Sequence, residues 1–165
     1  MDDMTSPLEH GEPGAGGTGS PIERRLVMRL LRYWRDKAEP HDMPARADIE
    51  IAAEPEFAPY CWVARLGADE KDLAFETIGE AFAIDQAQTL VGKKVAMASA
   101  GTLLAHATAY AANVVVCGVP MSFGGKFRHL DGRTLLFRSI ILPLRGSDAT
   151  IGYLLGGANY RAIHE

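Results

Sequence analysis

The sequence predicts an α+β fold, with a five-stranded antiparallel sheet, helices on one face of that sheet and an amphipathic N-terminal helix. Three observations predict this class. Apolar residues recur at helical spacing over residues 22–37, β-hairpins are indicated in residues 60–79 and 114–144, and an alanine-rich helical segment, residues 99–113, separates the hairpins. The order along the chain is helix, two strands, helices, three strands. We therefore expect the helices between the second and third strands to cover one face of the sheet.

The composition is that of one globular domain. The chain has 165 residues, 47% of them hydrophobic, and a net charge of −4. The sequence has no block of Lys and Arg residues that could contact the phosphates along a nucleic-acid backbone. No nucleic-acid partner is therefore expected. No apolar run reaches the roughly 18–20 residues of a membrane span, and no secretory signal is recognised, so we expect a cytoplasmic protein. Cys61 and Cys117 are interpreted as buried thiols, without a disulfide or a metal site.

The chain divides into three segments. Residues 1–20 are rich in Gly, Pro, Ser, Thr and acidic residues, and we expect a disordered tail there. Residues 21–39 are the amphipathic helix, which ends before Pro40, and residues 40–161 are the sheet domain. The arginine-rich face of the helix is expected to be solvated rather than bound to lipid. Its apolar stripe includes Leu26, Val27, Leu30, Leu31 and Trp34.

The elements of the sheet domain follow from residue alternation and from turn signals. Asp131–Gly132 is a tight-turn signal between two apolar strands. Short helical pieces are expected over residues 80–98, and bends or bulges near Gly118–Pro120 and Gly124–Gly125. The predicted strands are residues 60–67, 73–79, 114–130, 133–144 and 150–161.

Strand 133–144 has apolar side chains on both faces. A hairpin strand in an antiparallel sheet usually turns one face to water, so this pattern requires a cover on each side. The even positions include Leu136, Ile140 and Leu142, and the odd positions include Leu135, Phe137 and Ile141. We predict that the helix 22–37 covers the second face, because its apolar stripe needs a partner surface.

Several segments resemble a bacterial stand-alone PAS domain family (PAS_5-like). The stretch "LRYWRDKAEPHDMPARADIEI" resembles its opening signature, a helix ending in Y-W followed by a P-x-R-x-D-I loop. "FETIGEAF" resembles its strand-to-helix step, and "LVGKKV" is similar to its L-x-G segment. "FRHLDGRTLLFRSIILPLRG" and "YLLGGA" resemble its closing hairpin and last strand, so the resemblance extends over about residues 25–158.

The resemblance implies a PAS-like fold and a sensory or protein-interaction module that is not an enzyme. No kinase, cyclase, phosphodiesterase or DNA-reading domain fits beside it in 165 residues, so we expect action on another chain. Sensor histidine kinases and other PAS proteins are the expected partners. Regulation of this interaction by a small bound ligand is left open. We also expect a homodimer through residues 22–37, with Leu26, Val27, Leu30, Leu31 and Trp34 as the partner interface.

The candidate pocket residues are His106, Tyr110, Phe123 and Arg138. A haem-binding PAS domain uses a helical histidine as iron ligand, but a structural histidine is the favoured interpretation of His106. Arg138 lies among aliphatic residues, where it could meet a carboxylate ligand or pair with an acid across the sheet. Residues 80–98 contain no cysteine, so flavin photochemistry is nearly excluded. No cofactor, catalytic residue or metal ligand is predicted.

The alternative function is that of a small α+β enzyme such as a hot-dog thioesterase. This chemistry needs an acidic residue beside an oxyanion-binding helix N-terminus, and Asp85 is the nearest candidate. Gly156 and Gly157 on the last strand leave two interpretations open. They permit either the close approach of a ligand or partner helix, or a bulge.

Overall fold

The computed structural model describes residues 21–69 and 72–164, and it contains one five-stranded antiparallel sheet with the strand order β3-β2-β6-β5-β4. The predicted order of helix, two strands, helices and three strands is confirmed. The predicted disordered tail, residues 1–20, lies outside the described residues. The strands are β2 (Cys61–Leu66), β3 (Leu73–Ile78), β4 (Met121–Arg128), β5 (Thr134–Arg145) and β6 (Ile151–Ile163).

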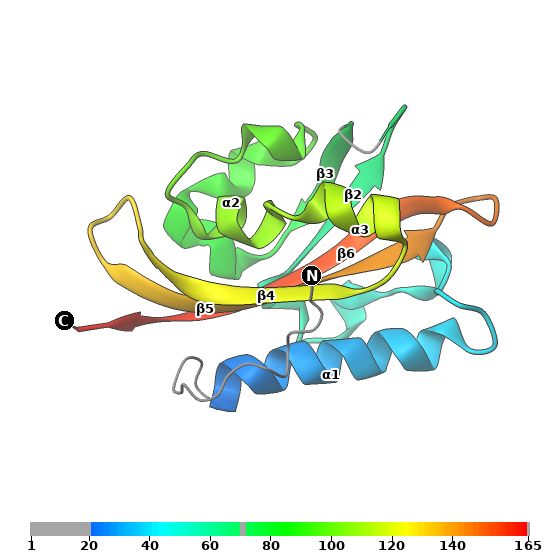
Figure 1. Cartoon of the computed structure of the whole chain (residues 1–165), viewed down its shortest axis with the longest axis horizontal. Coiled ribbons are helices and arrows are strands. Elements are labelled where there is room, and N and C mark those ends of the chain that lie inside the picture. Colours follow the sequence, from blue (N-terminus) through cyan, green and yellow to red (C-terminus); the bar gives the residue numbers. More distant parts are fainter. Residues whose placement is uncertain (1–20, 70–71, 165) are drawn as a thin grey trace.

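Helices lie on both faces of the sheet (Figure 1). The helix α1 (Pro21–Ala38) runs along one face, which we term the outer face. The helices α2 (Leu103–Thr108) and α3 (Ala111–Cys117) lie on the other, the inner face, together with the 3-10 turns between Glu80 and Met97. Within the described part of the chain, no helix has both the length and the apolar character to cross a membrane.

The outer face of the sheet is covered by α1, as the two apolar faces of the fourth strand predict. Leu30 of α1 is fully buried against the outer side chains of β5 and β6. The indole Nε1 of Trp34 donates a hydrogen bond of 2.8 Å to the Pro143 carbonyl, which fixes the C-terminal half of α1 to β5. The outer core comprises Leu26, Val27, Leu30 and Trp34 of α1 with Ile140, Leu142, Leu144, Leu155, Val63, Cys61, Ile49 and Phe57.

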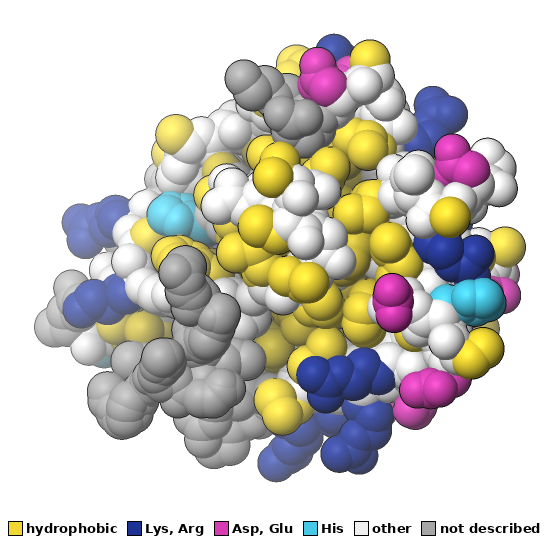
Figure 2. All heavy atoms as spheres, turned by 45° about the vertical axis from the view of Figure 1, so that its right-hand side comes forward, with side chains coloured by type: hydrophobic (Ala, Val, Ile, Leu, Met, Phe, Trp, Pro, Cys, Tyr) yellow, Lys and Arg dark blue, Asp and Glu magenta, His cyan; other side chains and the backbone are white. Residues whose placement is uncertain are grey.

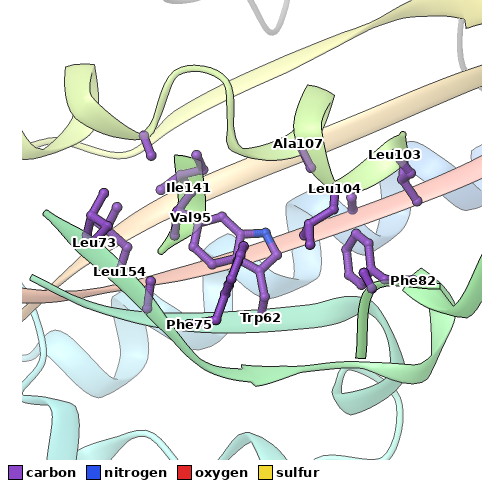
Figure 3. Close-up of a cluster of buried hydrophobic side chains, with 14 of the residues drawn as sticks. Trp62, Leu73, Phe75, Phe82, Val95, Leu103, Leu104, Ala107, Ile141 and Leu154 are labelled. Atoms are coloured by element: carbon purple, nitrogen blue, oxygen red, sulfur yellow. The ribbon is translucent and has the colours of Figure 1, made fainter. Parts of the chain in front are cut away.

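The inner core centres on Trp62, which points from β2 toward the helical layer (Figure 3). Its ring meets Phe75 edge-on at 6.0 Å between centroids. A Cβ on Gly156 would stand 2.0 Å from the indole, and a Cβ on Gly157 would stand 2.6 Å from Leu30 of α1. Pairing with β2 and β5 is regular at both glycines. The bulge is therefore not found, and the space beside the two glycines is filled by groups of the same chain, the Trp62 indole on one face and α1 on the other.

The segment 111–117 differs from the prediction, because the sequence predicts that a strand begins at Val114, whereas Val114–Cys117 belong to α3. A run of valines favours strands in isolation. Here Val114 is fully buried in the inner core, so packing of the helix against the sheet outweighs the local preference. Gly118 then ends α3 with a φ of 73°, in the left-handed region that suits glycine.

The strand β4 forms one edge of the sheet and pairs with β5 without a register shift from Met121–Ile141 to Arg128–Thr134. The prediction at Gly124–Gly125 was a bend or a bulge, and the bulge is not found there. The predicted turn at Asp131–Gly132 is confirmed, with Gly132 at a φ of 95°.

Candidate functional site

Aromatic side chains gather on the inner face where α2 and α3 meet β4 and β5. We term His106, Tyr110, Phe123, Phe127 and Phe137 the aromatic cluster. The His106 ring stacks on Phe127 with 3.9 Å between centroids, and Phe127 meets Phe137 edge-on at 5.6 Å. Tyr110 lies 5.8 Å from Phe123, which is 6.5 Å from Phe137. The rings thus form one continuous set of contacts.

The secondary structure explains why these rings meet. Side chains alternate along a strand, so Phe123 and Phe127 project from the same face of β4. His106 lies in α2, and Tyr110 lies just beyond it as the residue that precedes α3. Both rings meet aromatic rings of β4. Phe123 is 59% exposed, whereas Phe137 is buried. The cluster therefore reaches from the inner core to the surface at the edge strand.

The hydroxyl of Tyr110 is hydrogen-bonded, and burial favours the neutral forms of Tyr110 and His106. Ser139 donates a hydrogen bond of 3.1 Å to the Phe123 carbonyl, so the Tyr110 hydroxyl donates to Ser139 Oγ at 2.7 Å. Burial raises the pKa of Tyr110 well above its ordinary value. Burial also lowers the pKa of His106, and the carboxylate of Asp85 opposes that effect more weakly. The cluster offers flat apolar faces, so it suits a neutral aromatic or aliphatic molecule better than an anion.

Three of the four predicted pocket residues come together, and Arg138 does not. Phe137 and Ser139 of β5 face the inner layer, so the side chain between them projects to the outer face. The sheet therefore separates Arg138 from His106, Tyr110 and Phe123.

The five predicted interface residues lie on the side of α1 that faces its own sheet. Leu26, Val27, Leu30 and Trp34 are buried within the chain, and Leu31 is half-buried. The stripe is thus already occupied in a single chain, which leaves little of it for another molecule. A homodimer through residues 22–37 stays a prediction.

A buried carboxylate joins the helical layer to the β4–β5 hairpin, and sequence reasoning did not pair these residues. Asp85 accepts hydrogen bonds from the backbone N–H groups of Leu103 and Leu104, at 3.0 and 2.7 Å, and from His129 Nε2 at 2.7 Å. His129 Nδ1 accepts a hydrogen bond from the Asp131 N–H, so the proton of the neutral ring is on Nε2. No local signal connects residues 44 positions apart.

This arrangement removes the main support for the thioesterase alternative. Asp85 does lie at the N-terminus of α2, as that chemistry requires, but its oxygens are occupied by α2 and His129. Both ring nitrogens of His129 are also engaged. Among the described residues, no three His, Cys, Asp or Glu side chains gather in a group that could hold a metal ion.

A separate hollow of about 300 Å³ lies at the outer face, between β2–β3 and the connector that follows α1. Arg46 is the basic residue in its lining. Its Nε donates to Glu76 at 3.2 Å and its Nη1 donates to the Ile49 carbonyl at 3.1 Å. The guanidinium is therefore already committed to the chain itself, and the hollow has no comparable donor to offer a ligand.

Comparisons with known proteins find similar solved structures, but they identify no family for this chain. No family model matches the chain, and no curated protein matches it. Similar solved structures include the light state of the Aureochrome1 LOV photoreceptor, with 14% identity, a TM-score of 0.44 and coverage of 71% of this chain and 91% of that chain. The LOV domain of a blue-light activated histidine kinase from Erythrobacter litoralis has 14% identity, a TM-score of 0.45 and coverage of 64% and 98%. A LOV domain described with a flavin analogue has 13% identity, a TM-score of 0.47 and coverage of 69% and 83%.

The expectation that no cofactor binds, with flavin nearly excluded, is corrected by these comparisons. The three structures named above are LOV domains, one of them described with a flavin analogue, so the missing cysteine in residues 80–98 does not set flavin aside. In the described arrangement the Trp62 indole fills the inner core. Cys61 belongs to the outer core, and Cys117 is exposed at the end of α3, which corrects its prediction as a buried thiol.

The architecture agrees with what the segments "LRYWRDKAEPHDMPARADIEI" and "FRHLDGRTLLFRSIILPLRG" imply. Two strands, a helical layer and three strands make one antiparallel sheet, with an added helix on the outer face. The chain has a PAS-like α+β fold.

Proposed function

We propose that this chain is a PAS-type signalling module that has no catalysis of its own and acts by contact with another protein. The observation that carries the proposal is that a single strand, β5, serves both sides of the sheet. Its Phe137 and Ser139 belong to the aromatic cluster, while its Ile140 and Leu142 pack against α1. A change at the cluster therefore reaches α1 through one shared strand.

The proposed signal is a small apolar molecule that binds at the aromatic cluster. Ring faces without charge recognise such a molecule by burial of apolar area and by stacking. Phe123 is partly open to solvent, so a ligand can reach the rings from the edge of the sheet. Such a ligand controls α1 only if it binds more tightly to one arrangement of β5 and α1 than to another.

The proposed partners are a sensor histidine kinase, another PAS protein or a second copy of this chain. The segments that resemble the bacterial stand-alone PAS family support this class of partner. A homodimer through α1 would use the half-buried Leu31 and the exposed Met28, because the rest of the stripe packs on the sheet. Sedimentation of the full chain tests this contact. A dimer that Leu31→Glu dissociates supports it, and a monomer at all concentrations refutes it.

Native mass spectrometry of freshly purified protein tests the ligand. We expect a bound small molecule that Phe123→Ala releases and Val116→Ala retains, because Val116 is exposed on α3. Hydrogen exchange then tests the coupling, since the ligand should change the protection of α1 amides as well as those of β4. A ligand that leaves α1 unchanged would contradict the proposed transmission through β5.

A further inference from the structure

The connector between α1 and β2 encloses a hollow together with the outer side of the sheet. The helix α1 packs mainly on β5 and β6, so the outer side of β2 is left to residues 46–60, which form three short 3-10 turns. The hollow of about 300 Å³ lies between these turns and the strands β2 and β3. Its volume is at the lower end of the range for small-molecule sites, about 300–1,000 Å³.

The inner part of the hollow is apolar and uncharged. Cys61 and Val63 of β2 line it, and both are buried in the outer core together with Ile49. Burial raises the pKa of the Cys61 thiol to about 12, so the sulfur is neutral at physiological pH. An alkyl chain therefore finds matching surface there. The other apolar residues of the lining are Ile51, Ala52, Ala58 and Ile78.

An irregularity in β3 fixes the wall of the hollow. The register of β2 and β3 shifts after Val63, which makes Glu76 an extra residue of β3. Such bulges redirect a side chain and are frequent beside functional sites. Here Glu76 holds the guanidinium of Arg46, which also bonds to the Ile49 carbonyl. The turn that covers the hollow is thus tied to the sheet without any ligand.

The charged residues of the lining leave one negative charge uncompensated. Arg46 is paired with Glu76 at 3.2 Å between Nε and Oε1, so these two charges cancel. Glu50 is the other charged residue of the lining and is exposed. Its carboxylate forms no ion pair with any residue of 21–69 or 72–164. The mouth of the hollow therefore favours a cation over an anion.

We infer that the hollow binds a small aliphatic amine, with its alkyl chain against Cys61 and Val63 and its ammonium group beside Glu50. The alkyl chain gains by burial of apolar area, and the ammonium group supplies the charge that compensates Glu50. A primary alcohol matches the apolar part alone, and a fatty acid places a second carboxylate beside Glu50. Both should therefore bind more weakly than the amine.

Occupation of the hollow bears on α1. Ile49, Cys61 and Val63 share the outer core with Leu30 of α1, so a bound amine stabilises the connector and the helix together. Hydrogen exchange of residues 46–60 and of α1 should slow when the amine is bound. The sheet separates this site from the aromatic cluster on the inner face, so failure of the inference would leave the proposed function untouched.

Titration of the full chain with hexylamine, followed by amide shifts in NMR spectra, tests the inference. Hexylamine is protonated at pH 7, as the lysine amine is. We expect saturable shifts in residues 46–63. An exposed ion pair changes affinity by about twofold to fivefold, so hexylamine should bind more tightly than 1-hexanol by that factor at about 0.01 M salt. The difference should vanish at about 1 M salt, and hexanoate should bind most weakly.

Two matched pairs of variants separate charge from shape. Glu50→Gln should remove the preference for hexylamine over 1-hexanol, whereas Glu54→Gln, at an acid of the same connector outside the lining, should retain it. Ala58→Leu places a larger side chain in the lining and should abolish binding of both molecules. Ala105→Leu, at a half-buried alanine of α2 on the inner face, should not.

Apolar surface elsewhere on the molecule supplies the contrary outcome. Val116 in α3 and Val119 just after it are 71% and 52% exposed, and Figure 2 shows hydrophobic side chains gathered over the middle of one face. Shifts confined to α3 or β4, no saturable shifts in residues 46–63, or equal affinity for hexylamine and hexanoate would overturn the inference. Each result is read from the unchanged chain, so it holds even where a variant does not fold.

Discussion

The contact between Trp62 and Gly156 predicts a large effect from a single methyl group. In Gly156→Ala the new Cβ would stand 2.0, 2.2 and 2.4 Å from three indole atoms, far inside van der Waals contact. The indole has no exposed area and meets Phe75 edge-on, so it cannot retreat without disturbing the inner core. Overpacking of this kind costs up to about 3 kcal/mol, and loss of glycine flexibility in the unfolded chain returns about 0.5–1 kcal/mol.

We therefore expect Gly156→Ala to lower the free energy of unfolding by about 2 kcal/mol. For a chain of this size, this corresponds to about 4–8 °C in the midpoint of thermal unfolding. Urea unfolding followed by circular dichroism measures the difference. Gly125→Ala is the matched control, because its Cβ would stand 3.6 Å from Phe137 in ordinary contact, and we expect no loss of stability.

A double-mutant cycle assigns the effect to the indole. Trp62→Phe removes the atoms that the new Cβ would meet, so Gly156→Ala should cost at least about 1 kcal/mol less in that background. Two results would refute the reasoning. One is a Gly156→Ala variant within about 0.5 kcal/mol of the unchanged chain, and the other is full additivity of the two substitutions.

Three further predictions concern the hydrogen bonds and the titration of the described residues. Asp85→Ala leaves two N–H groups of α2 and His129 without their buried acceptor, so we expect a loss of about 3–5 kcal/mol by urea unfolding; a loss below about 1 kcal/mol would contradict this role. Trp34→Phe removes the bond to Pro143, and should cost about 1–3 kcal/mol and speed hydrogen exchange in α1; unchanged α1 exchange would speak against that tie. Burial lowers the pKa of His106 below 6.5, so the unfolded chain binds that proton more readily and stability should fall as pH drops below 6.5. His106→Gln should flatten this slope between about pH 8 and about pH 5 in urea midpoints, and an identical slope would exclude His106 as its source.

Periodicity and turn chemistry were sufficient for most of the fold. The helical spacing of Leu26, Leu30 and Trp34 predicted α1, and Asp131–Gly132 predicted the turn before β5. The apolar residues on both faces of β5 predicted a cover on each side, and this led to the placement of α1 on the outer face. These features are local, so the chain records them within a few residues.

Contacts between segments far apart in the sequence could not be predicted from the sequence alone. The bond between Asp85 and His129 joins positions 44 residues apart, and the burial of Val114 in a helix depends on the sheet beneath it. Strand alternation places Arg138 and Phe137 on opposite faces of β5. It does not determine which of the two faces packs against α2 and α3. The sequence by itself therefore determined the elements, their order and the apolar faces of each. The tertiary structure decided which face is inner, which aromatic rings meet there and which polar atoms are paired, because each depends on groups that only folding brings within contact distance.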